Sequence, residues 1–104
     1  MSDLKQFIAI IKPFREDFLT NPDDEEMAIM SQHFEYLQNL MKKGLILLAG
    51  PTTNEKNPFG IIILNVNSKN KAEKLIRNDP SIRLQIQKLI ELEPFRVSLL
   101  NQNS

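Results

Sequence analysis

Residues 21–51 read NPDDEEMAIMSQHFEYLQNLMKKGLILLAGP, which predicts a long amphipathic helix followed at once by a short apolar strand. Asn21 suits the N-cap and Pro22 the first helical position, and the acidic run behind them suits the positive end of the helix dipole. Apolar residues then recur with helical spacing, at Met27, Met30, Phe34, Leu37 and Met41. Because Gly44 follows two lysines as a typical helix end, we predict a helix from about Pro22 to Gly44 whose methionine stripe packs in the core.

Short apolar runs on both sides of this helix predict strands, because their length and their β-branched content favour strands over helices. These runs occupy residues 7–11, 45–49, 59–66 and 92–100. Ser68 can cap a second helix that ends at Asp79-Pro80, and residues 81–89 have the spacing of a further short helix. The order strand, helix, strand, strand, helix, strand predicts an α+β protein with the ferredoxin-like βαββαβ fold and an antiparallel sheet.

The length of the chain and the pattern of its strands predict a dimer. The 104 residues suit a single domain over 1–104 that ends in a polar tail at 101–104. Helices cover only one face of such a sheet, yet the predicted strands are apolar on both faces. An uncovered second face would expose a large apolar patch to water. We therefore expect a symmetric homodimer joined through the sheet faces.

The composition limits the possible partners and cofactors. The 13 basic residues balance 13 acidic ones, so no excess of positive charge favours nucleic acid or an anionic membrane as partner. The lack of cysteine excludes disulfides and thiolate sites. The single histidine leaves a histidine-rich metal site without ligands, unless a dimer contributes a second copy. No glycine-rich dinucleotide loop is present, so we expect neither a cofactor nor a metal. The sequence shows no signal-peptide pattern and no apolar run of membrane-spanning length, which favours a cytoplasmic protein.

Several polar residues are candidates for a ligand site, and each has a structural alternative. His33 lies at the edge of the apolar stripe, either as a general acid or base or as a boundary histidine satisfied by water or backbone. Gly50-Pro51-Thr52 can place backbone groups and a hydroxyl at a pocket mouth, or form only a tight turn. Lys12 and Arg15 can bind an anionic ligand or be solvated. Tyr36 lies off the stripe, which favours the surface or a dimer rim.

The order of several short motifs resembles that of the YciI-like (YCII-related) domain family. The motifs are His33, the helix end at residues 40–44, the apolar strand that closes with Ala49-Gly50-Pro51, Asn78-Asp79-Pro80 and Glu93-Pro94-Phe95. The resemblance implies a dimeric α+β barrel with a site in which His33 lies near Asp79. It also implies relatives that resemble lactone-converting or dehalogenating enzymes, which move protons on aromatic rings without a cofactor. The stretches 14–21 and 53–57 depart from many relatives.

Two functions fit these residues. In the first, a cofactor-independent enzyme binds a small, partly apolar molecule between the helices and the sheet, and His33 moves a proton while Asp79 orients the ring. In the second, a non-catalytic binding or regulatory module uses the same pocket. Catalysis requires His33 and Asp79 within hydrogen-bond reach, or one water apart, and facing a cavity, whereas Asp79 before a proline also suits a simple turn. The edge position of His33 predicts that His33→Ala leaves the fold intact.

Overall fold

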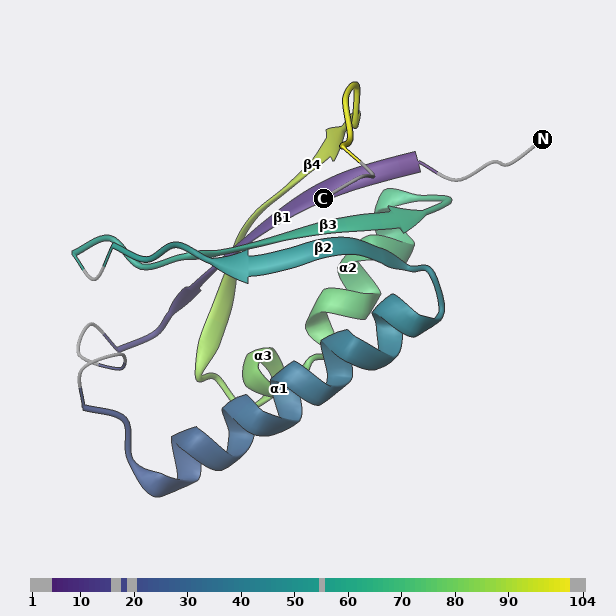
Figure 1. The fold of residues 1–104 in the computed structure, drawn as a ribbon. Helices are drawn as coiled ribbons and strands as arrows, with labels where there is room; N and C mark the ends of the chain where they lie inside the picture. The colour runs from purple at the N-terminus through teal and green to yellow at the C-terminus, as the bar shows by residue number, and fades with distance from the viewer. Residues whose placement is uncertain (1–4, 16–17, 19–20, 55, 102–104) are drawn as a thin grey trace.

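The computed structural model describes residues 5–15, 18, 21–54 and 56–101. Its elements are β1 (Lys5–Pro13), α1 (Asp24–Lys42), β2 (Ile46–Pro51), β3 (Gly60–Val66), α2 (Lys69–Arg77), α3 (Pro80–Arg83) and β4 (Gln87–Phe95). The strands form one antiparallel sheet in the order β2-β3-β1-β4, and all the helices lie on one of its faces (Figure 1). The predicted α+β fold with βαββαβ order is confirmed. Of the predicted polar tail only Asn101 is described, and parts of the stretches 14–21 and 53–57 also lie outside the described residues.

The start of α1 differs from the prediction, because Asp23 and not Asn21 is the N-cap. The Asp23 carboxylate accepts from Glu26 N at 2.7 Å, and Glu26 Oε1 accepts from Asp23 N at 2.9 Å. This reciprocal capping box needs an acidic side chain three residues after the cap, a spacing that the Asp23–Glu26 pair provides. Glu26 also forms an ion pair with Arg15. The hydrogen bond from the Arg15 guanidinium and, to a smaller extent, that from the Asp23 N–H lower the pKa of Glu26. The acidic run thus anchors the helix start.

The core contains a different face of α1 from the predicted one. Ile29, Leu37 and Leu40 are buried, whereas Met27 and Met41 are about half exposed. The prediction of a methionine core stripe is therefore wrong for Met27 and Met41, whereas Leu37 of that stripe does reach the core. The helix turns an adjacent column of side chains toward the sheet and α2. Tyr36 belongs to that column and is half-buried, and its hydroxyl donates to Leu75 O at 2.7 Å. Burial, followed by the charge of Asp79, raises the pKa of Tyr36.

The segment between α2 and the sheet also departs from the prediction. The last helix is confined to Pro80–Arg83, and β4 begins at Gln87 and ends at Phe95 instead of spanning 92–100. Gln85 stops the helix with φ of 61°, and Ile86 N donates to Ser81 O at 2.9 Å as the chain turns back. Pro94 is tolerated inside β4 because this strand lies at the edge of the sheet. No helix in the described part of the chain is long and apolar enough to cross a membrane.

The left-handed backbone of Gln85 yields a stability prediction. A side chain is strained at φ of 61°, and glycine is not. We expect Gln85→Gly to raise the free energy of unfolding by about 0.5–1 kcal/mol, measured by chemical denaturation. Gln32→Gly is the matched control, because Gln32 is exposed within α1 and glycine there should lower stability by about 1 kcal/mol. A loss of stability in Gln85→Gly would show that the turn is not strained.

The sheet face opposite the helices is apolar at its centre. Side chains alternate along a strand, so Ile8 and Ile10 of β1 point away from the buried Phe7, Ala9 and Ile11. Their cross-strand partners on β3 are also isoleucines, Ile63 and Ile61, whereas the partners on β4 are Glu93 and Glu91. Ile63 is only 4% exposed, and its cross-strand partner Leu48 of β2 is 47% exposed. The face therefore combines an isoleucine centre with an acidic edge.

We expect this outer face to join two copies of the chain, as the sequence predicts. Light scattering of the wild type at micromolar concentration should give about twice the chain mass of 12.0 kDa. Ile8→Lys should give the monomer mass, because it places a charge at the centre of the paired faces. The neighbouring Glu93 can pair with the new lysine in the separated monomer, which keeps the fold. Lys71→Glu, on the exposed side of α2, should leave the mass unchanged. A monomeric wild type would contradict the expectation.

Candidate functional site

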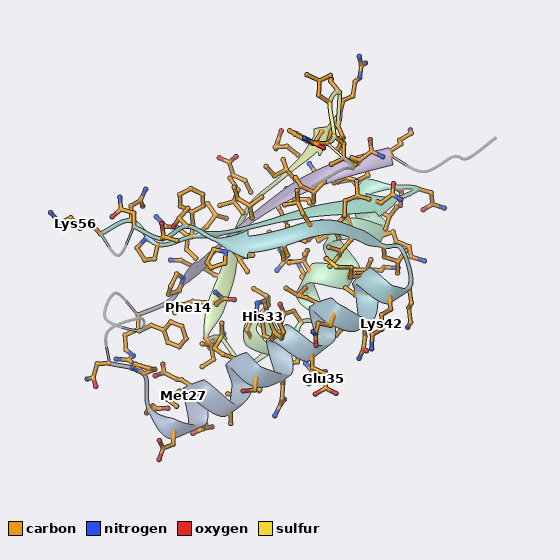
Figure 2. All side chains as sticks on the ribbon, in the orientation of Figure 1. Phe14, Met27, His33, Glu35, Lys42 and Lys56 are labelled. Atoms are coloured by element: carbon orange, nitrogen blue, oxygen red, sulfur yellow. The ribbon has the colours of Figure 1, made fainter. Side chains whose placement is uncertain are left out.

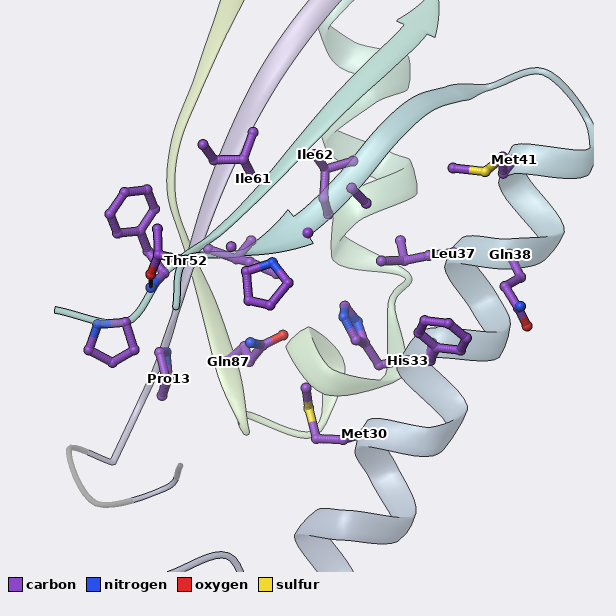
Figure 3. Close-up of a pocket in the computed structure, with 18 residues that line it drawn as sticks. Pro13, Met30, His33, Leu37, Gln38, Met41, Thr52, Ile61, Ile62 and Gln87 are labelled. Carbon is purple, nitrogen blue, oxygen red and sulfur yellow. Dashed lines mark hydrogen bonds between the residues drawn. The ribbon is translucent and has the colours of Figure 1, made fainter. Parts of the chain in front are cut away.

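A cavity of about 490 Å³ lies between α1 and the end of the sheet where β1 and β2 finish and β3 and β4 start (Figure 3). Its volume falls within the range of small-molecule pockets. Four side chains of α1 form an apolar wall: Met30, Phe34, Leu37 and Met41. Four of the five stripe residues therefore line the cavity, and Leu37 among them also belongs to the core. Phe34 belongs to this wall and is 63% exposed.

His33 reaches from α1 into the layer between the helices and the sheet. Figure 2 shows it pointing inward, whereas Glu35 and Lys42 point away from the sheet. Only 12% of the His33 side chain is exposed, and its Nδ1 lies 2.5 Å from Asp79 Oδ2. His33 also belongs to the cavity wall. The edge position inferred from the sequence is thus an inward position, and the contact with Asp79 occupies only one ring nitrogen.

Asp79 is held in place by its own backbone surroundings. It is the N-cap of α3, its side chain is completely buried, and its Oδ1 accepts from Ser81 N at 2.9 Å. Its Oδ2 is therefore the oxygen that faces His33. A carboxylate accepts hydrogen bonds and does not donate them, so the neutral ring carries its proton on Nδ1 and presents the lone pair of Nε2. The pair can therefore accept a proton at Nε2 and stabilise the resulting imidazolium.

Two further polar residues extend this pair and were not identified from the sequence. Ser81 Oγ lies 3.3 Å from His33 Nδ1 and donates to Gln87 Oε1 at 3.0 Å. Both residues are buried, and Gln87, the first residue of β4, lines the cavity. For Ser81 the sequence did offer a signal: it stands two residues after Asp79, where the backbone N–H of a helix start is bonded by the capping side chain. Gln87 gave no signal, because the sequence placed it inside a helix.

The other candidate residues fall into two groups. Gly50, Pro51 and Thr52 line the cavity on the side of β2. Thr52 also closes the β2–β3 hairpin, since Thr52 N donates to Phe59 O at 2.8 Å and Thr52 Oγ1 accepts from Phe59 N at 3.2 Å. Lys12 does not line the cavity, because its side chain points to the opposite side of β1 from its lining neighbours Ile11 and Pro13. Its Nζ instead donates to Asn57 Oδ1 at 3.2 Å. Within the described residues, no cluster of three or more potential metal ligands is found.

Comparison with known proteins identifies the family. The model of the YCII-related domain matches residues 6–96. A similar solved structure is the 5-chloro-2-hydroxyhydroquinone dehydrochlorinase of Burkholderia phenoliruptrix in complex with 2,5-dihydroxybenzoquinone, with a TM-score of 0.59 and 21% identity over 88% of this chain and 91% of that one. At this identity the likeness concerns the fold. No curated protein matches the chain significantly. Since the family model covers most of its length, the chain belongs to the YCII-related domain family.

Proposed function

We propose that this protein is a cofactor-independent enzyme that performs acid–base chemistry on a small, partly apolar molecule through His33 and Asp79. The observation that carries the proposal is the contact of 2.5 Å between His33 Nδ1 and the buried Asp79 carboxylate, beside a cavity with mostly carbon walls. A histidine with a purely structural role does not need a cavity beside it, and a purely apolar binding pocket does not need a histidine–carboxylate pair in its wall. Their combination is the arrangement expected of a positioned general base.

In this proposal His33 Nε2 takes a proton from the bound molecule and later returns it, to another atom of that molecule or to a leaving group. Asp79 keeps the ring oriented and stabilises the imidazolium while it exists. The apolar wall excludes water, which strengthens the electrostatic interactions among the reacting groups. Isomerisation, elimination and lactone chemistry all fit this minimal set. The dehydrochlorinase with the same fold supports a ring-sized oxygenated molecule as the first one to test.

The test uses the purified protein in deuterium oxide without any added cofactor. Ring carbonyls and phenols, 2,5-dihydroxybenzoquinone among them, are added one by one, and proton NMR follows exchange of carbon-bound hydrogens, isomerisation and loss of substituents. The proposal expects at least one compound whose conversion or exchange depends on the protein. Saturable binding without conversion would instead support the regulatory module, since a sensor needs the cavity alone. If no compound of the series is bound or converted, both functions are contradicted.

A further inference from the structure

The side-chain amide of Gln87 has a feature that the pair of His33 and Asp79 does not explain. Gln87 is only 8% exposed, and its Oε1 is already occupied by the Ser81 hydroxyl. In the described part of the chain, Gln87 Nε2 has no hydrogen-bond partner. Every fully buried side-chain nitrogen in that part of the chain does have a partner, so Gln87 Nε2 is not fully buried. The amide nitrogen therefore retains accessible surface, and Gln87 lines the cavity. A nearly buried donor in that position calls for an acceptor on a bound molecule.

The direction of the hydrogen bonds fixes which end of the Gln87 amide faces the cavity. Asp79 can only accept, so His33 Nδ1 carries a hydrogen that Asp79 and, at 3.3 Å, Ser81 Oγ can accept. The Ser81 hydroxyl then has its own hydrogen for Gln87 Oε1. The amide oxygen is thus held inward and the NH₂ group is directed to the ligand. One buried carboxylate orients both His33 and Gln87 through a connected network.

The remaining polar side chains of the cavity do not compete for the ligand. Within the described residues four lining side chains are polar: His33, Gln38, Thr52 and Gln87. Thr52 Oγ1 accepts from Phe59 N at 3.2 Å and lies 3.4 Å from Asn57 O, so it is engaged in its hairpin. Figure 3 shows the Gln38 amide pointing away from His33 and Gln87. A ligand therefore meets one base, His33 Nε2, and one side-chain donor, Gln87 Nε2, within an apolar wall.

We propose that Gln87 selects the substrate class: an apolar cyclic carbonyl compound with an acidic hydrogen next to the carbonyl, whose oxygen accepts from the Gln87 amide. This inference rests on the proposed function. His33 Nε2 takes the α hydrogen as a proton, and the C–H electron pair becomes the C=C bond of an enolate. The carbonyl π pair moves onto the oxygen, where the Gln87 N–H stabilises the new negative charge. The imidazolium exchanges its N–H proton with solvent and a proton from it returns to carbon, so no oxidant or reductant is needed.

The first measurement detects the contact itself. β-Tetralone, a bicyclic ketone with acidic α hydrogens, and tetralin, its oxygen-free counterpart, are titrated into isotope-labelled wild-type protein. The Gln87 side-chain amide signal is identified by its absence from the Gln87→Leu spectrum. The ketone should shift this signal and tetralin should not, and Gln87→Leu should weaken ketone binding about 10-fold. An unchanged Gln87 signal, with or without ketone binding elsewhere in the cavity, would overturn the inference.

The second measurement tests the role in proton transfer. Exchange of the α hydrogens of β-tetralone in deuterium oxide should be accelerated by the wild type and about 100-fold slower in Gln87→Leu. Ser81→Ala should give an intermediate loss, because the amide remains but is free to turn. Gln32→Leu, on the exposed side of α1, should exchange like the wild type. Equal rates in wild type and Gln87→Leu would overturn the inference.

The two proposals fail in different ways. If exchange needs His33 but not Gln87, the acid–base function stands and the inference on Gln87 falls. If the ketone shifts the Gln87 amide signal but His33→Asn exchanges as fast as the wild type, Gln87 binds the carbonyl while the proposed function falls. The Gln87→Leu and His33→Asn variants therefore report on separate groups of one site.

Discussion

Replacing Asp79 with alanine should lower the free energy of unfolding by about 2–4 kcal/mol, more than any other change to the site. The Asp79 carboxylate is completely buried and accepts from Ser81 N and His33 Nδ1. Alanine removes the N-cap of α3, leaves Ser81 N without this acceptor and leaves His33 Nδ1 with only the longer contact of 3.3 Å to Ser81 Oγ. Chemical denaturation followed by circular dichroism measures the loss.

Asp79→Asn is the matched control for this prediction. Asparagine keeps an oxygen that can cap Ser81 N, but it cannot hold a protonated imidazole by charge. We expect it to cost about 1–2 kcal/mol, less than alanine, because most donors near it still find a partner. If Asp79→Ala lowers the free energy of unfolding by less than an exposed substitution such as Lys71→Ala does, the His33–Asp79 contact adds nothing to stability.

The order of the elements followed from the sequence because it depends on local signals. Apolar runs of strand length, the acidic helix start and Gly44 after two lysines each act within a few residues. The face of α1 that enters the core did not follow from them. The column with Met30 and Phe34 and the column with Ile29 and Leu40 are both apolar, and only packing against the sheet and α2 selects between them. The unselected column became the wall of the cavity.

The candidate site was accessible from the sequence only in part. Family resemblance pointed to His33 and Asp79, which are 46 residues apart and could not be joined by spacing alone. Gln87 was missed because the turn before it depends on Gln85 with positive φ, a conformation that glycine usually signals. Lys12 could not be assigned to a face until the register of β1 was known, since a shift by one residue exchanges the two faces.

Replacing His33 with asparagine should reduce turnover of any compound found in the screen by about 10²–10⁴-fold, the usual contribution of a positioned acid or base. Asparagine can still donate from its amide to Asp79 Oδ2, so the buried carboxylate keeps a partner, but it offers no basic nitrogen to the cavity. The free energy of unfolding should therefore change by less than about 1 kcal/mol. Rates from proton NMR and unfolding curves of the same sample give both quantities.

His33→Ala completes the test and revises the expectation drawn from the sequence. Because His33 is only 12% exposed and partners a buried carboxylate, alanine should destabilise the fold by about 1–3 kcal/mol instead of leaving it untouched. Loss of activity in His33→Ala alone would then be ambiguous, whereas loss in the stable His33→Asn assigns the chemistry to the imidazole. An active His33→Asn would make the histidine a structural partner of Asp79 and leave the cavity to a binding role. An inactive and stable one would place the proton transfer at Nε2, the ring nitrogen that Asp79 leaves free.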